Sequence, residues 1–143
     1  MLNDSTKEKP IVFTGDYYES IQCLLSDYVS LLKPNVIWIE YRVIPVLDLI
    51  RGLQIHPHLT NIIFFLQIPT IKALDLLLGS NELFSISQND FSTIIIDFPK
   101  DFPLSNDIQV KLRELAKTLH ILLLMPDNLL PKTGVELIQV GIT

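Results

Sequence analysis

Short apolar runs recur along most of this chain, separated by longer stretches with a helical repeat. Each run is too short for a helix and is rich in Ile, Leu, Val and Phe, which is typical of a buried β-strand. Five such runs are Ile11–Thr14, Val36–Tyr41, Ile62–Leu66, Thr93–Phe98 and Ile121–Met125. A later segment, Val135–Ile142, alternates well enough to predict a sixth, terminal strand.

Between the runs, apolar residues return at intervals of three and four, as on one face of a helix. Such repeats follow Asp16, Pro45, Pro69 and Ser105–Asp107. Asp16, with Glu19 three residues later, resembles a capping box. Near-continuous apolar strands alternating with helices predict a parallel sheet covered on both faces. The expected fold class is therefore α/β, three-layered and doubly wound.

Length and polarity indicate one domain. The 143 residues fit a single core. Residues 1–10 form a polar lead without the features of a signal peptide, and 11–143 form the expected domain. No apolar run reaches the ~20 residues of a membrane span, so we expect an intracellular protein of the nucleus or cytoplasm, with no membrane partner.

Composition points to a protein interface. Charged residues make up 19% of the chain and the mean hydropathy is +0.37, whereas soluble domains average about 25% charged residues. Excess apolar surface usually marks an interaction site.

The single cysteine, Cys23, excludes a disulfide framework, and His56 and His58 lack the further ligands that a structural zinc site needs. We therefore predict no metal site.

The charge balance argues against a free-standing nucleic-acid binder. Eleven Lys and Arg face sixteen Asp and Glu, a formal net charge of −5, whereas phosphate binding is driven by basic residues. Contact with DNA through a local patch or within a complex is not excluded.

Polar residues after the strands resemble the remains of a nucleotide site. The first strand leads into Gly15-Asp-Tyr-Tyr-Glu-Ser20, where a phosphate-binding loop would read G-x-x-x-x-G-K-[ST]. The second Gly and the Lys are missing. Asp97 ends the fourth strand, where a Walker B carboxylate would stand, and the segment Lys111–Asn128 reads as a helix, a buried strand and a polar sensor region at Asp127 or Asn128.

This arrangement, over roughly residues 11–128, resembles the RecA/RadA recombinase superfamily and its paralogues. The resemblance implies a three-layer RecA-like (P-loop NTPase-like) core with a mostly parallel sheet, truncated after the fifth strand. It also implies a vestigial nucleotide site at Gly15, Ser20 and Asp97. Arg42 stands near the position of the family's catalytic carboxylate, and Glu40 lies two residues early. We therefore expect a degenerate paralogue that is not an enzyme, with no catalytic residues and no cofactor.

The resemblance further implies partners. Paralogues that have lost nucleotide binding typically act within accessory complexes, here one for homologous recombination or DNA repair on single-stranded DNA. The family's loops after the fourth and fifth strands approach DNA, which makes Lys100 and Lys132 the DNA-binding candidates. The chain is expected to form a heterodimer with a recombinase paralogue, or a homodimer, burying more than about 1,000 Å². The interface candidates are Tyr17, Tyr18, Val135 and Leu137, beside the strand Ile11–Thr14 and within the terminal strand.

Two alternatives remain open at this stage. One is an ATPase-dead RecA-like subunit of another assembly, such as the ring of the Elongator tRNA-modification complex. The other is a small flavodoxin-like nucleotide-binding enzyme that uses Asp16, Glu40 and Asp97 at its strand ends. Strand order separates the folds: a central first strand flanked by the fourth favours the RecA-like interpretation, and a second strand at the edge favours the flavodoxin-like one.

Overall fold

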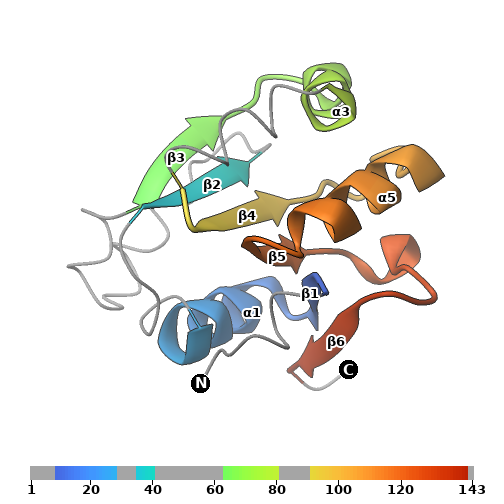
Figure 1. The fold of residues 1–143 in the computed structure, drawn as a ribbon. Coiled ribbons are helices and arrows are strands. Elements are labelled where there is room, and N and C mark those ends of the chain that lie inside the picture. The colour runs from blue at the N-terminus through green and yellow to red at the C-terminus, as the bar shows by residue number, and fades with distance from the viewer. Residues whose placement is uncertain (1–8, 29–34, 41–62, 81–90, 142–143) are drawn as a thin grey trace.

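The computed structural model describes residues 9–28, 35–40, 63–80 and 91–141. Its strands are β1 (Ile11–Gly15), β2 (Val36–Glu40), β3 (Ile63–Gln67), β4 (Thr93–Asp97), β5 (His120–Leu124) and β6 (Glu136–Val140). Its helical elements are α1 (Tyr17–Cys23), the π-helical turn η2 (Leu24–Tyr28), α3 (Ile71–Gly79), α5 (Asn106–Leu115) and the 3₁₀ turn η5 (Asp127–Leu129) (Figure 1). All six strand predictions are confirmed with boundaries shifted by one or two residues. The expected helix after Pro45 lies outside the described residues.

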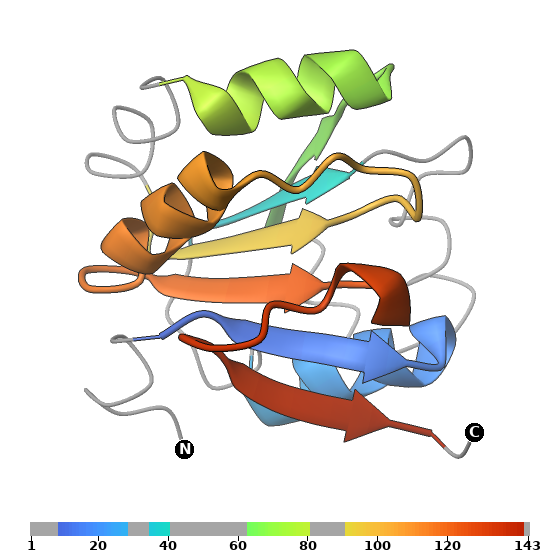
Figure 2. The same ribbon diagram turned by 90° about the vertical axis from the view of Figure 1, so that its right-hand side faces the viewer.

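The six strands form one sheet in the order β3-β2-β4-β5-β1-β6, and every neighbouring pair is parallel. Figure 2 shows the arrows of the successive strands pointing the same way. The predicted parallel sheet is therefore confirmed. The order that would favour the RecA-like interpretation, with the fourth strand beside the first, is not observed, because β1 is flanked by β5 and β6. A flavodoxin-like order would place β2 at the edge of the sheet and beside β1. Here β2 is internal, and β1 and β2 are not adjacent.

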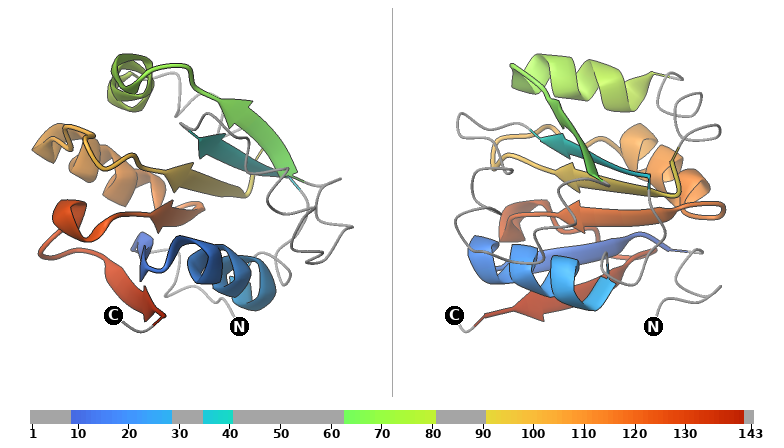
Figure 3. Two further views of the ribbon diagram at one scale, coloured as in Figure 1. Left: turned by 180° about the vertical axis from the view of Figure 1, so that it is seen from behind. Right: turned by 90° about the vertical axis from the view of Figure 1, so that its left-hand side faces the viewer.

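Side chains of the internal strands alternate between two buried layers, as the period of a strand requires. On β4, Ile94 and Ile96 contribute to the layer under α3 and α5, whereas Ile95 points to the layer under α1 and η2. Figures 1 and 3 show these helices on opposite faces of the sheet. The three-layer α/β architecture is therefore confirmed.

Each described α-helix begins at a side-chain cap. The N–H groups of Glu19, Ala73 and Ile108 donate to the side chains of Asp16, Thr70 and Ser105. These bonds satisfy backbone donors that the first turn of a helix leaves unpaired. Asp16 fulfils the expected capping role, and of the two candidates for the last helix the cap is Ser105.

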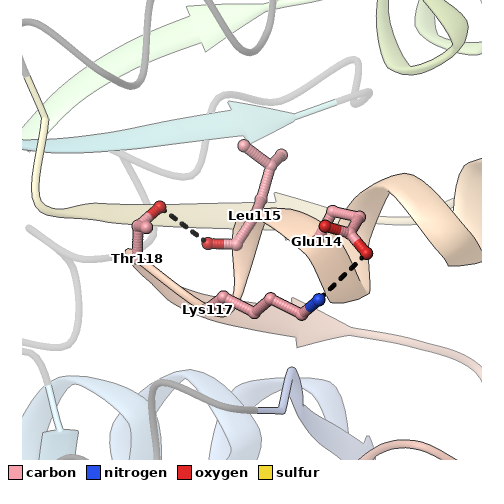
Figure 4. Close-up of polar contacts among 4 residues, drawn as sticks. All are labelled: Glu114, Leu115, Lys117 and Thr118. Carbon is pink, nitrogen blue, oxygen red and sulfur yellow. Dashed lines mark hydrogen bonds and ion pairs between the residues drawn. The ribbon is translucent and has the colours of Figure 1, made fainter.

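The end of α5 is held by its own residues. Thr118 Oγ1 donates to the carbonyl of Leu115 at 3.4 Å, and Lys117 Nζ lies 3.1 Å from Glu114 Oε1 (Figure 4). Both charged side chains are more than half exposed, so this ion pair contributes at most about 1 kcal/mol.

Among the described helices, none has the length and apolarity to cross a bilayer.

Candidate functional site

Three polar side chains end neighbouring strands at the carboxyl edge of the sheet. Gln67, Glu40 and Asp97 occupy matched register positions on β3, β2 and β4. Each lies an even number of residues from a strand residue packed under α1, such as Trp38 or Ile95, so all three belong to the α1 face. Glu40 and Asp97 are 1% and 2% exposed. The fold therefore places two buried carboxyl groups side by side where ligands bind in parallel sheets.

Tyr17 contacts one carboxyl group of this row. It is the first residue of α1, and its hydroxyl donates to Asp97 Oδ2 at 2.5 Å. The ring is half-buried and packs against the core layer under α1. The residue at the Walker B-like position therefore has one carboxylate oxygen bound by a phenol from the turn that would carry the phosphate loop.

The turn between β1 and α1 is closed by the end of β6. Gly15 has φ +107°, and a Cβ at this position would lie 2.0 Å from the carbonyl oxygen of Val140. The N–H of Asp16 donates to that same oxygen at 3.0 Å. Gly141 is equally confined, because a Cβ there would lie 2.6 Å from Glu19 Oε2. The main chain of β6 therefore packs directly on the turn.

Three amides at this turn and in the first turn of α1 are engaged. Asp16 N–H donates to the carbonyl of Val140, Glu19 N–H donates to the side chain of Asp16, and Ser20 N–H donates to the carbonyl of Asp16. A phosphate loop works by aiming successive free N–H groups at the anion. Here the N–H groups of Asp16 and Glu19 are used for contact with β6 and for capping instead.

Ser20 is placed inside the helix rather than at its start. It lies one turn into α1, is 2% exposed, and its Oγ has no hydrogen-bond partner among the described residues. The cap at the helix start is Asp16, not Ser20. Of the three residues of the vestigial site, Asp97 and Gly15 lie at the edge and Ser20 is buried beneath it.

A second pair of contacts ties the β5–β6 connection to the rest of the edge. Thr14 Oγ1 donates to Asp127 Oδ1 at 2.5 Å, and Asn128 Nδ2 donates to the carbonyl of Lys100 at 2.9 Å. The two residues of the expected sensor region therefore fix η5 against β1 and against the β4–α5 loop. The sequence signalled these polar residues but not their partners, because the contacts span 113 and 28 residues.

The DNA-binding candidates lie on different parts of the surface. Lys100 is exposed in the turn after β4, beside the exposed Asp101. Lys132 is also exposed, on the segment that returns from η5 to the start of β6 at the opposite edge of the sheet. Acidic residues accompany Lys100 at the carboxyl edge, where Asp16, Asp101 and Asp127 are all exposed.

The interface candidates divide into two half-buried and two exposed residues. Tyr18 and Leu137 are 52% and 51% exposed. The hydroxyl of Tyr17 donates a hydrogen bond to Asp97, and Val135 packs against the core layer under α5. The strand Ile11–Thr14 is internal to the sheet, so the expectation that it is an adhesive surface element is wrong.

The thiol of Cys23 is a poor nucleophile. Burial raises its pKa from 9.0 to about 11, and its hydrogen bond to Asp27 Oδ2 at 3.4 Å raises it further in the same direction. Burial likewise raises the pKa of Tyr28, the last residue of η2. Within the described ranges no cluster of three His, Cys, Asp or Glu residues forms a metal site, and His56 and His58 lie outside those ranges.

No protein-family model matches this sequence, and the search of curated proteins finds no match. The resemblance to the recombinase superfamily therefore stays a prediction from the sequence.

Proposed function

We propose that the chain is a non-catalytic RecA-like subunit of a homologous recombination or DNA-repair accessory complex. In this proposal it binds a sister paralogue and assists a recombinase filament on single-stranded DNA. The observation that carries the proposal is the closed β1–α1 turn, in which Gly15 packs on Val140 and Tyr17 binds Asp97. These contacts support a site that keeps the layout of a nucleotide edge and has exchanged ligand binding for internal contacts.

Two further features support this interpretation over an active enzyme. The flavodoxin-like alternative needs β1 beside β2, and the observed sheet separates them by β4 and β5. Glu40 and Asp97 are almost inaccessible, whereas an acid or base must reach its substrate within hydrogen-bond distance. A RecA-like core stays our proposal for this sheet, although β1 lies beside β5 and β6 rather than beside β4.

Nucleotide binding is the first test. Titration of the full chain with ATP and magnesium in a calorimeter is expected to give no binding in the micromolar range. A micromolar dissociation constant would overturn the proposal, because the proposal requires that Val140 and Tyr17 close the turn to a phosphate group. Because Gly15 and Tyr17 form the contacts that close the turn, the titration tests the closure of this turn.

The assembled complex is the second test. Purification of the tagged chain from its own cells is expected to recover a recombinase paralogue. Filament assembly on single-stranded DNA is then measured with Lys100 and Lys132 both replaced by Ala, and with exposed Lys72 on α3 replaced as the matched control. A reduced effect for the double variant alone supports the proposal. Recovery of a tRNA-modification assembly instead would contradict it.

A further inference from the structure

The outer side of β6 is an open row of main-chain hydrogen-bonding groups. Glu136 N–H donates to the carbonyl of Pro10 at 2.9 Å, and the carbonyl of Val140 accepts from Asp16 at 3.0 Å. Main-chain groups of a strand alternate in direction, so Glu136, Ile138 and Val140 face β1. The N–H and C=O groups of Leu137 and Gln139 consequently point away from the sheet.

Nothing in the described part of the chain pairs with this side of β6, which ends the sheet in Figures 2 and 3. Leu137 is 51% exposed and Gln139 is exposed. Natural edge strands are usually protected by Lys, Pro or a bulge. The five-residue segment Glu-Leu-Ile-Gln-Val contains no Lys or Pro, and its one charged residue stands at its start, so the edge from Leu137 to Gln139 is suited to accept another strand.

We propose that β6 pairs antiparallel with β6 of a second copy of this chain, across a two-fold axis at Ile138. In that register Leu137 lies opposite Gln139 of the second copy. Both residues have outward main-chain groups, so each such pair exchanges two hydrogen bonds. Ile138 lies opposite its own copy as a non-hydrogen-bonded pair, consistent with its main-chain groups facing β1.

The side chains are compatible with this self-pairing. Glu136, the one charged residue of β6, lies opposite Val140 of the second copy, so the two carboxylates do not face each other. A slip of one residue would set outward groups against inward ones and lose the hydrogen bonds. Because a two-fold contact uses the same patch on both copies, the pairing closes and leaves no further edge at β6. This inference does not rest on the proposed function.

The oligomeric state tests the proposal directly. Light scattering of the full chain over a dilution series is expected to give a dimer of twice 16.3 kDa. Leu137→Lys places a charge at the seam and is expected to give a monomer with an unchanged circular dichroism spectrum. Val110→Lys, a matched change at a 41% exposed residue of α5, is expected to remain dimeric. A monomeric wild type, or a dimeric Leu137→Lys variant, would overturn the proposal.

Disulfide trapping tests the register independently of stability. In a Cys23→Ser background, Ile138→Cys sets two thiols opposite each other in a non-hydrogen-bonded pair, with Cα atoms ~4.5 Å apart. That separation falls within the range that a disulfide spans. Incubation with oxidised glutathione is expected to link this variant into a covalent dimer and to leave Gln139→Cys unlinked. Efficient linkage of Gln139→Cys in place of Ile138→Cys would contradict the proposed register.

Discussion

Two connections at the carboxyl edge of the sheet differ in what holds them. The turn from β1 to α1 contains only Asp16, and the loop from β4 to α5 runs over residues 98–105. The short turn is fixed by residues distant in sequence, since Gly15 packs on Val140. The long loop combines a local and a distant contact: Phe102 is 2% exposed and packs edge-on against Phe98, with ring centroids 5.0 Å apart, and the carbonyl of Lys100 accepts from Asn128 Nδ2.

The two connections also differ in the side chains that they expose. The β1–α1 turn is closed by the main chain of Val140 and by the hydroxyl of Tyr17, and it exposes Asp16 and Tyr18. The β4–α5 loop buries its own aromatic anchor and leaves Lys100 and Asp101 exposed. The exposed lysine is therefore found at the second connection and not at the first.

The largest expected effect is at the closed turn. Gly15→Ala forces a Cβ against the carbonyl of Val140 at a positive φ. Backbone strain and overpacking each cost about 1–3 kcal/mol, so we expect the free energy of unfolding to fall by roughly 2–6 kcal/mol. Urea denaturation measures the change.

Gly79→Ala is the matched control for that substitution. Gly79 ends α3, and nothing lies within 4 Å of the position of its Cβ. Alanine is favoured over glycine in a helix by up to about 1 kcal/mol, so this variant should be as stable as the wild type or slightly more stable. Equal losses at both glycines would show that the contact with Val140 does not confine the turn.

A smaller effect is expected at the hydroxyl that joins the turn to β4. Tyr17→Phe removes the donor to Asp97 Oδ2, and the loss of one partner of a buried polar group costs about 1–3 kcal/mol. Tyr18→Phe, at a residue 52% exposed, should change stability by less than about 0.5 kcal/mol. Thermal unfolding of both variants distinguishes a structural hydroxyl from an ordinary surface tyrosine.

The sequence was sufficient to predict the sheet but not the closure of its edge. Strands such as β4 and β5 are buried on both faces and therefore read as unbroken apolar runs. Asp97 was found for a similar reason, because a carboxylate directly after such a run marks a strand end. The order of the strands could not be predicted from the sequence, since strand pairing depends on contacts between distant segments.

The role of Tyr17 shows the same limit. Its place beside the turn was evident from the sequence, but its hydrogen bond to Asp97 spans 80 residues. Gly15 was identified as the remnant of a phosphate loop, and the contact that requires a glycine there comes from β6. Local chemistry therefore drew attention to Gly15, Tyr17 and Asp97, and the sheet order decided their partners.

At the open loop, a local contact sets the expected loss. Ser105 Oγ accepts from Ile108 N–H and begins α5. Replacement of such a cap by alanine costs about 0.5–2 kcal/mol, so Ser105→Ala should lower the free energy of unfolding by about 1 kcal/mol. Ser105→Asp keeps an acceptor at the same place and should restore most of the loss in urea denaturation. If Ser105→Asp does not restore the stability, the loss in Ser105→Ala does not come from the cap bond to Ile108 N–H.

The smallest effect concerns Cys23, where α1 passes into η2. Its pKa is raised to about 11, mainly by burial and then by Asp27, so the folded thiol is protonated at neutral pH and should react slowly with iodoacetamide. A raised pKa stabilises the fold fully below the unfolded value of 9.0, and this contribution is lost as pH rises towards 11. Asp27→Asn removes the carboxylate beside the thiol and should speed alkylation several-fold without reaching the rate of the urea-unfolded chain, because burial remains. Asp107→Asn, the same change in the first turn of α5, should leave the rate of alkylation unaltered. An equal acceleration by both variants would show that the net charge of the protein, and not the carboxylate beside Cys23, sets the rate.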